Sequence, residues 1–303
     1  MIAKNTPTHP WFRLTAPAAG PHASGRLPAH FITAEQKRKT SQQFAEEYLC
    51  DFTTAERHVF SEDSIARAFT AAALPFDENS RQFHSHLPTH PFYFLALDFG
   101  FINDHSALVL LEFRATPTGT RDAATWQPLY RRQLHLRLVE RFPLGTPFAQ
   151  VIARVARLAE HPLIKNHASL AFDATGMGLP LRQQLEQQRL PLNLVPINIT
   201  SGQTANLTAH GRNVPKADLV SRLELLLEQN HLQIAADAPQ AASLRDELLQ
   251  FERHHRPGGR TNYSARGAQH DDLVMSLALA GWWAWENRKS LLSGAPHKPL
   301  SFW

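Results

Sequence analysis

The sequence is poor in cysteine and in long apolar runs. Its single cysteine is Cys50, so no disulfide can form within the chain, and the composition fits a reducing compartment. No apolar run reaches the roughly 18 residues that a membrane-spanning helix requires. The first residues, MIAKNTPTHPWF, lack the apolar centre of a signal peptide. These absences argue against a disulfide-stabilised or membrane-embedded protein and predict a cytoplasmic one with no membrane partner.

Two nucleotide-binding patterns are absent as well. The P-loop pattern GxxxxGK[ST] occurs nowhere in the chain, which excludes ATP hydrolysis through a Walker-type loop in these residues. The letters DFG stand at 98–100, but the chain has no glycine-rich loop followed by a VAIK-type strand and no HRD-type loop upstream. The chain is therefore not a protein kinase, and the carboxylate of Asp98 needs another explanation.

The chain does contain enough apolar material for a core, together with a small excess of positive charge. Of its 303 residues 43% are hydrophobic, and 31 basic side chains against 27 acidic ones give a formal charge of +4. This balance permits a phosphate-rich partner without requiring one. The basic stretch 251–267, FERHHRPGGRTNYSARG, is interrupted by glycine. It fits a hairpin lying on a phosphate backbone or a solvated loop, and its candidate phosphate contacts are Arg253, Arg256, Arg260 and Arg266.

Apolar periodicity predicts a mixed α/β fold. Strands at 92–99, 106–114 and 130–144 follow one another and form an antiparallel meander. Strand and helix then alternate, which adds parallel strands at 169–176 and 192–199 and completes a five-stranded sheet. Thr146 is expected to cap a helix that has Pro147 in its first position. A polar helix is predicted at 34–49, and the helices that flank the sheet are predicted at 146–161, 179–189, 216–230, 244–254 and 270–288.

Acidic side chains stand at the ends of three apolar elements. Asp98 closes the first strand, Asp173 closes the fourth, and Asp271 and Asp272 open the last helix. A buried ionised carboxylate is unfavourable unless a cation or hydrogen bonds compensate it. Converging carboxylates fit one or two hard divalent cations, Mg²⁺ or Mn²⁺, and two such ions about 4 Å apart support phosphodiester hydrolysis. Each residue alone also fits a turn or a helix cap.

In this order the motifs resemble the nuclease domain of the large terminase subunit of tailed bacteriophages and prophages, a member of the ribonuclease H-like superfamily. The resemblance covers about residues 40–285. It rests on FAEEYLCDF, HVFSEDSIARAF, LALDFGFINDHSALVLL, FPLGTPFAQVIARV, FDATGMGLPLRQQL, VPKADLVSRLELLLEQNHLQI and HDDLVMSLALAGWWA. It implies a ribonuclease H-like sheet with metal ligands at Asp98, at Asp173 and at the HDD helix start, where Asp272 is favoured over Asp271.

The resemblance also implies a function and partners. The chain is expected to be an endonuclease that uses two Mg²⁺ or Mn²⁺ ions to cut concatemeric double-stranded DNA during genome packaging in a bacterial host cell. The implied partners are a packaging ATPase domain or subunit, the small terminase subunit and the portal. Asn103, Asp104 and His270 are auxiliary candidates, and Lys216 is a candidate phosphate contact. Turn, cap or solvated roles fit these four residues as well.

Domain organisation and function retain alternatives at this level. Residues 1–55 are expected to be an arm with a helix, derived from an ATPase-to-nuclease connection, residues 56–290 the nuclease domain, and residues 291–303 a tail. Without a P-loop, the chain is either an excised nuclease domain or a stand-alone gene product. The alternative functions are a ribonuclease H-like nuclease of the junction resolvase or transposase type, and an inactive prophage remnant that only binds DNA or a packaging partner.

Overall fold

The computed structural model describes residues 17–20, 25–51, 58–80, 91–100, 104–175, 178–202, 204–209, 211–255, 261–265 and 270–292. Contacts divide the chain into two compact units, Met1–Arg57 and His58–Trp303. The domain boundaries predicted at residues 55 and 290 stay predictions. No helix in the described ranges is long and apolar enough to cross a membrane.

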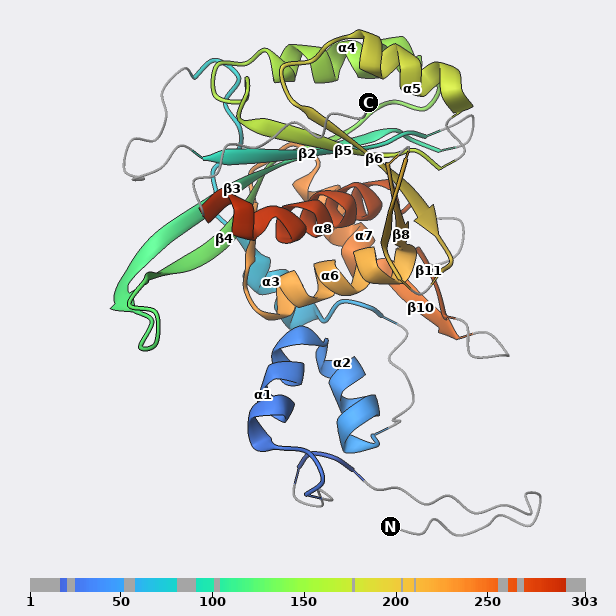
Figure 1. The fold of residues 1–303 in the computed structure, drawn as a ribbon. Helices are drawn as coiled ribbons and strands as arrows, with labels where there is room; N and C mark the ends of the chain where they lie inside the picture. Colours follow the sequence, from blue (N-terminus) through green and yellow to red (C-terminus); the bar gives the residue numbers. More distant parts are fainter. Residues whose placement is uncertain are drawn as a thin grey trace, which may run out of the picture. The chain divides into compact units, whose positions relative to one another are not determined.

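The larger unit is built on one mixed sheet (Figure 1). In its described part nine strands lie in the order β1-β9-β4-β3-β2-β5-β6-β8-β7. The predicted mixed sheet is confirmed, but it has more than five strands. The additional strands were not predicted because they are only two to five residues long and carry no periodic pattern. The bounds are β1 Phe69–Thr70, β2 Phe92–Asp98, β3 Ala107–Arg121, β4 Pro128–Arg141, β5 Ala168–Asp173, β6 Asn193–Thr200, β7 Asn206–Thr208, β8 Gly211–Pro215 and β9 Leu232–Ala235.

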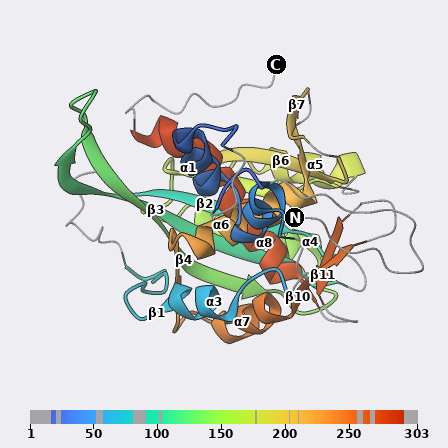
Figure 2. The ribbon, with the colours of Figure 1, turned by 90° about the horizontal axis from the view of Figure 1, so that it is seen from below.

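Helices cover both faces of this sheet (Figure 1). One face carries α4 (Phe148–Ala159) and α5 (Gly178–Gln187). The other carries α8 (Asp272–Leu292), which packs on the strands, and α6 (Lys216–Glu228), which packs on α8; in the view from below, both are seen in front of the strands (Figure 2). The same side holds α3 (Glu62–Ala68) and α7 (Ala241–Gln250). In the larger unit the sheet thus lies between helices, and on the α8 side α6 packs outside α8.

Strand β2 lies at the centre of the sheet and is buried on both faces. It runs antiparallel to β3 and parallel to β5. Because side chains alternate along a strand, Phe94 and Ala96 join the core on the α8 side, whereas Leu95 and Leu97 join the core on the α4 side. Burial on both faces explains why FYFLALD reads as a continuous apolar run.

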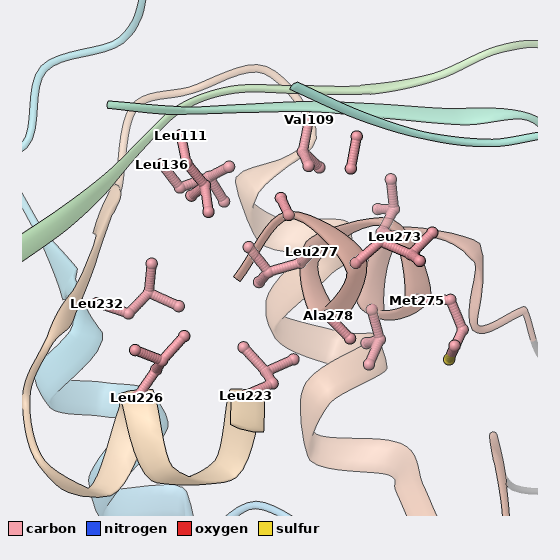
Figure 3. Close-up of a cluster of buried hydrophobic side chains, with 14 of the residues drawn as sticks. Val109, Leu111, Leu136, Leu223, Leu226, Leu232, Leu273, Met275, Leu277 and Ala278 are labelled. Carbon is pink, nitrogen blue, oxygen red and sulfur yellow. The ribbon is translucent and has the colours of Figure 1, made fainter. Parts of the chain in front are cut away.

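Helix α8 is apolar around most of its circumference because it is enclosed. Leu273 and Leu277 lie between strand residues such as Val109 and the α6 residue Leu223, as Figure 3 shows. Helix α8 therefore has no wide polar face over its first turns, and its position is fixed from two sides. The predicted buried helix at 270–288 is confirmed with a later start.

Two helix ends differ from the prediction. Helix α4 begins at Phe148 with Pro147 as its N-cap, and the hydroxyl of Thr146 donates to the carbonyl of Pro143 at 2.6 Å instead of capping the helix. The helix predicted at 244–254 ends at Gln250, because residues from Phe251 onward form a strand. That strand, β10 (Phe251–His255), pairs antiparallel with β11 (Thr261–Ala265), so the predicted hairpin is present in this segment.

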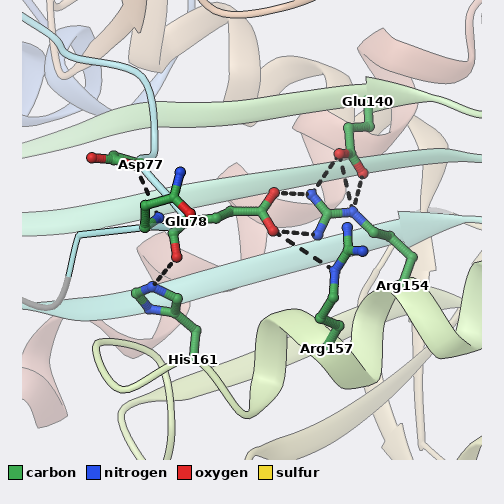
Figure 4. Close-up of polar contacts among 7 residues, drawn as sticks. Asp77, Glu78, Glu140, Arg154, Arg157 and His161 are labelled. Atoms are coloured by element: carbon green, nitrogen blue, oxygen red, sulfur yellow. Dashed lines mark hydrogen bonds and ion pairs between the residues drawn. The ribbon is translucent and has the colours of Figure 1, made fainter.

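A cluster of charged side chains ties α4 to β4 and to the chain near residue 78 (Figure 4). Arg154 donates to both carboxylate oxygens of Glu140, at 2.9 Å from Nε to Oε2, and also to Glu78. The imidazole of His161 lies 3.2 Å from the carbonyl oxygen of Glu78. The hydrogen bonds from Arg154 lower the pKa of Glu78. These contacts hold α4 along the sheet on the side opposite α8.

The smaller unit contains short helices where one helix was predicted at 34–49. Helix α1 spans Ala29–Arg38, α2 spans Ser41–Phe44, and a π-helical turn continues from Ala45 to Leu49. The prediction of one helix is wrong because Thr40 interrupts it: its hydroxyl accepts from the amide of Gln43 in a capping box that starts α2. Helix α1 also begins at Ala29, five residues before the predicted start at residue 34.

Candidate active site

Two of the predicted carboxylates lie side by side at the ends of neighbouring strands. Asp98 is the last residue of β2 and Asp173 is the last residue of β5. The two strands are parallel, and Leu97 pairs with Phe172 in their register. Parallel strands end at the same edge of a sheet, so the register brings Asp98 and Asp173 together.

The third acidic position reaches this edge through α8. Asp272 is the first residue of α8, and the carbonyl of Asp271 accepts the amide of Met275 at 2.9 Å in the first helical turn. One turn into the helix, the buried hydroxyl of Ser276 donates to the carbonyl of Ala96 at 3.0 Å. This hydrogen bond joins α8 to β2 two residues before Asp98. The start of α8 is thereby held against the strand ends.

These residues line one open pocket of about 390 Å³. All four predicted carboxylates of the metal site line it. Its lining residues are Asp98, Phe99, Gly100, Asp104, Asp173, Thr175, Ile199, Lys216, Asp271, Asp272 and Met275. Of the auxiliary and phosphate-contact candidates, Asp104 and Lys216 line the pocket, whereas Asn103 lies outside the described residues.

The carboxylates disfavour one another's charge. Burial, followed by the charges of Asp173, Asp272 and Asp271, raises the pKa of Asp98 well above its ordinary value, against a smaller opposing effect of Lys216. Burial also raises the pKa of Asp173, although the amide and hydroxyl of Thr175 oppose this. The protein side chains alone therefore do not neutralise the pocket, and a bound cation would stabilise the charged forms.

Asp272 meets the requirements of a metal ligand better than Asp271 does. Burial raises the pKa of Asp272, and its Oδ2 is buried without a hydrogen-bond partner among the described residues. The nearest ion-pair contact of this oxygen is Nδ1 of His270, at 3.8 Å. Asp271 instead faces Lys216, whose Nζ lies 3.4 Å from its Oδ2. A buried carboxylate oxygen without a hydrogen-bond partner among the described residues, such as Oδ2 of Asp272, suits the binding of a hard divalent cation such as Mg²⁺ or Mn²⁺ when other carboxylates lie beside it.

His270 and Asp104 form a group with Asp272. One ligand atom from each of the three lies within 4.8 Å of the other two. His105, which the sequence reasoning missed, packs against His270 with ring centroids 4.7 Å apart, and its Nδ1 lies 2.8 Å from the carbonyl oxygen of Phe142. The signal available in the sequence was weak, because His105 carries no spacing that distinguishes it from a turn residue.

The predicted capping role of the aspartate pair is filled by a residue that the sequence did not reveal. The amides of Leu273 and Val274 donate to Oε2 of Glu247 in α7, at 3.1 and 3.2 Å. Glu247 also forms an ion pair with Arg141 at the end of β4. The carboxylates of Asp271 and Asp272 are therefore not the acceptors for these two amides.

One predicted DNA contact is wrong. The side chain of Arg253 is buried, and its Nη2 lies 3.1 Å from Oε2 of Glu224 on α6, so it holds the β10–β11 hairpin to the core and does not face solvent. The other predicted contacts in this segment, Arg256, Arg260 and Arg266, lie outside the described residues.

Comparisons with known proteins show which proteins the chain resembles. No protein-family model matches the chain. The large terminase subunit of Thermus phage G20c is 26% identical to it over 240 residues, which are 78% of this chain and 40% of that protein. The resemblance to the large terminase nuclease domain is confirmed. The chain thus spans about two fifths of the length of the curated relatives it matches.

Solved terminase structures share the fold. The large terminase of a thermophilic bacteriophage superposes with a TM-score of 0.50 at 10% identity, covering 85% of this chain and 52% of that one. The large terminase nuclease of phage G20c with bound magnesium covers 75% of this chain and 98% of that one, with a TM-score of 0.48 at 24% identity. The mixed sheet flanked by helices that the sequence predicts is the fold of this chain, and the thermophilic phage terminase shares it.

Proposed function

We propose that the chain is a divalent-metal-dependent DNA endonuclease of the large-terminase type. The observation that carries this proposal is the convergence of Asp98, Asp173 and Asp272 in one open pocket, where burial raises the pKa of each carboxyl group. Such a site favours a divalent cation, and terminase large subunits are the curated relatives of the chain.

Each pocket residue has a distinct role in this proposal. Asp98, Asp173 and Asp272 would hold the ions, and the charges of both other acids act on Asp98. When bound, two divalent ions supply Lewis-acid stabilisation of the attacking and leaving oxygens of a phosphodiester. Lys216 lines the same pocket and presents an ammonium group that can bind a DNA phosphate.

The substrate and partners follow from the same proposal. The substrate is concatemeric double-stranded DNA, bound mainly through phosphates, so that sequence readout is weak. A packaging ATPase domain or subunit, the small terminase subunit and the portal are the proposed partners. The proposed site of action is the bacterial host cell.

A plasmid-cleavage assay tests the proposal. Supercoiled DNA should be nicked and linearised with Mg²⁺ or Mn²⁺, and chelator should stop the reaction. Asp98→Asn should abolish cleavage, whereas Asp218→Asn, which alters a half-buried aspartate of α6 away from the pocket lining, should leave it intact. Cleavage that persists in chelator, or in the Asp98 variant, contradicts the proposal. A marked preference for four-way junctions over linear duplex would instead favour a resolvase.

A further inference from the structure

The first turn of α8 is capped by a side chain from another helix. Oε2 of Glu247 in α7 accepts the amides of Leu273 and Val274 at 3.1 and 3.2 Å, and all three residues are buried. A carboxylate at a helix N-terminus satisfies amides that have no partner within the helix and also interacts favourably with the helix dipole. This cap is usually supplied by the residue just before the helix.

The external cap leaves the aspartates at the helix start available to the pocket. If the carboxylate of Asp271 accepted these amides, it would turn toward the helix and away from the other acids. In the structure Asp271 instead faces Lys216. Asp272 lines the pocket with a buried Oδ2 that accepts no hydrogen bond within the described ranges. The amides of the first turn therefore do not compete for the oxygens that a cation would need.

Glu247 is itself held by the sheet that carries Asp98. Its carboxylate forms an ion pair with Arg141, the last residue of β4, and the side chains of Arg141 and Glu247 are 19% and 9% exposed. Arg141 pairs with Ala107 in β3, and Ala107 pairs with Asp98 in β2. A continuous path of backbone pairing and one ion pair thus joins the end of β2 to the start of α8.

We infer that Glu247, held by Arg141, is a positioning residue of the metal centre, which fixes the start of α8 so that the carboxylate of Asp272 meets those of Asp98 and Asp173. The inference rests on the proposed function. Glu247 does not line the pocket, so it acts through Asp272 and not on the substrate.

Two variants separate capping from charge. Glu247→Gln keeps an oxygen acceptor at the cap. Combining Glu247→Met with Arg141→Met removes the cap and the ion pair together, which leaves no buried charge without a partner and favours a folded protein. Together the two substitutions remove one positive and one negative charge, so they leave the net charge near the pocket unchanged. Weaker binding in the double variant must then come from lost geometry.

The readout is the dissociation constant for Mn²⁺ on the intact chain without DNA, measured by calorimetry. We expect about tenfold or greater weakening in the double variant, the range seen when residues that orient metal ligands are removed. Glu247→Gln should stay closer to wild type than to the double variant. In an Asp272→Asn background the same double substitution should have little further effect on Mn²⁺ binding, because coupled residues do not act additively.

A buried ion pair at the other end of the sheet provides the matched control. Glu112 pairs with Arg137, both are buried, and Glu112 lies opposite Tyr93 near the start of β2. Replacing this pair by two methionines should leave the Mn²⁺ dissociation constant unchanged. Wild-type Mn²⁺ affinity in the folded Glu247–Arg141 double variant, or an equal loss in the Asp272→Asn background, would overturn the inference. Absence of Mn²⁺ binding by wild type would refute the proposed function itself.

Discussion

Replacing Gly100 by alanine should damage the pocket without touching a carboxylate. Gly100 lines the pocket two residues after Asp98, and its amide donates to the hydroxyl of Ser106 at 3.1 Å. A Cβ at this position would overlap the carbonyl oxygen of Asp104 and lie 2.5 Å from its carbonyl carbon, whereas ordinary contacts of a Cβ begin at 3.4 Å. The obstructing atoms belong to the backbone, so a side-chain rotation cannot relieve the overlap. The backbone at Asp104 must move by about 1 Å, the difference between these distances.

The size of the effect follows from this displacement. A shift of about 1 Å in a catalytic arrangement reduces rates by roughly 100-fold, equivalent to about 2.7 kcal/mol in the activation free energy. The assay is plasmid cleavage at saturating Mn²⁺, with the melting temperature recorded in parallel. Gly202→Ala is the matched control, because a Cβ there meets only the hydroxyl of Thr200 at 3.4 Å. Wild-type cleavage by a folded Gly100→Ala variant would show that this turn does not set the pocket geometry.

Three further predictions concern charge. Asp98→Asn should raise the melting temperature of the metal-free protein, and more so at pH 8 than at pH 5. Burial raises the folded-state pKa of Asp98, so the ionised carboxylate destabilises the wild-type fold as pH rises above the pKa of the unfolded chain. A variant that melts at pH 8 at the same temperature as wild type, or lower, contradicts this. His135→Leu should reduce the loss of folding stability at low pH. Burial lowers the pKa of His135 from 6.5 to about 4, so the wild type loses about 3 kcal/mol of unfolding free energy as pH falls from 7 to 4. Urea unfolding of both proteins at pH 7 and pH 4 measures this loss. Replacing Arg256, Arg260 and Arg266 by alanine should reduce the slope of the logarithm of the duplex-binding constant against the logarithm of salt concentration by roughly 0.9 per lost phosphate contact. An unchanged slope would show that these arginines do not contact DNA phosphates.

The parts of the fold that the sequence revealed are those with strong local signals. Strand β2 is a long apolar run that ends in an acid, and α8 is a long apolar helix, so both were found. Strands β1 and β9 were not predicted because they have only two and four residues; β1 is defined by its pairing with β9, and β9 by its pairing with β1 and β4. The helix expected through His254 stops at Gln250 because pairing between β10 and β11 overrides the local periodicity.

Some residues of the candidate site were predictable from the sequence, and others were not. The acids Asp98, Asp173 and Asp272 were predictable because a carboxylate at the end of a buried element is unfavourable without compensation. Glu247 was not, because it lies inside an ordinary helical pattern and its role depends on how α7 meets α8. Arg253 was assigned to DNA from charge alone, and only the structure shows that its charge is used inside the protein by Glu224.

The most direct test of the account is a crystal structure of the wild-type chain grown with Mn²⁺, with anomalous scattering measured to locate the ions. The account predicts anomalous peaks in the pocket within about 2.5 Å of carboxylate oxygens, with Asp98, Asp173 and Asp272 among the ligands. The same crystals of Asp98→Asn should lack full occupancy at these peaks. A wild-type pocket without any peak, or ions bound elsewhere while the three carboxylates stay unliganded, would contradict it.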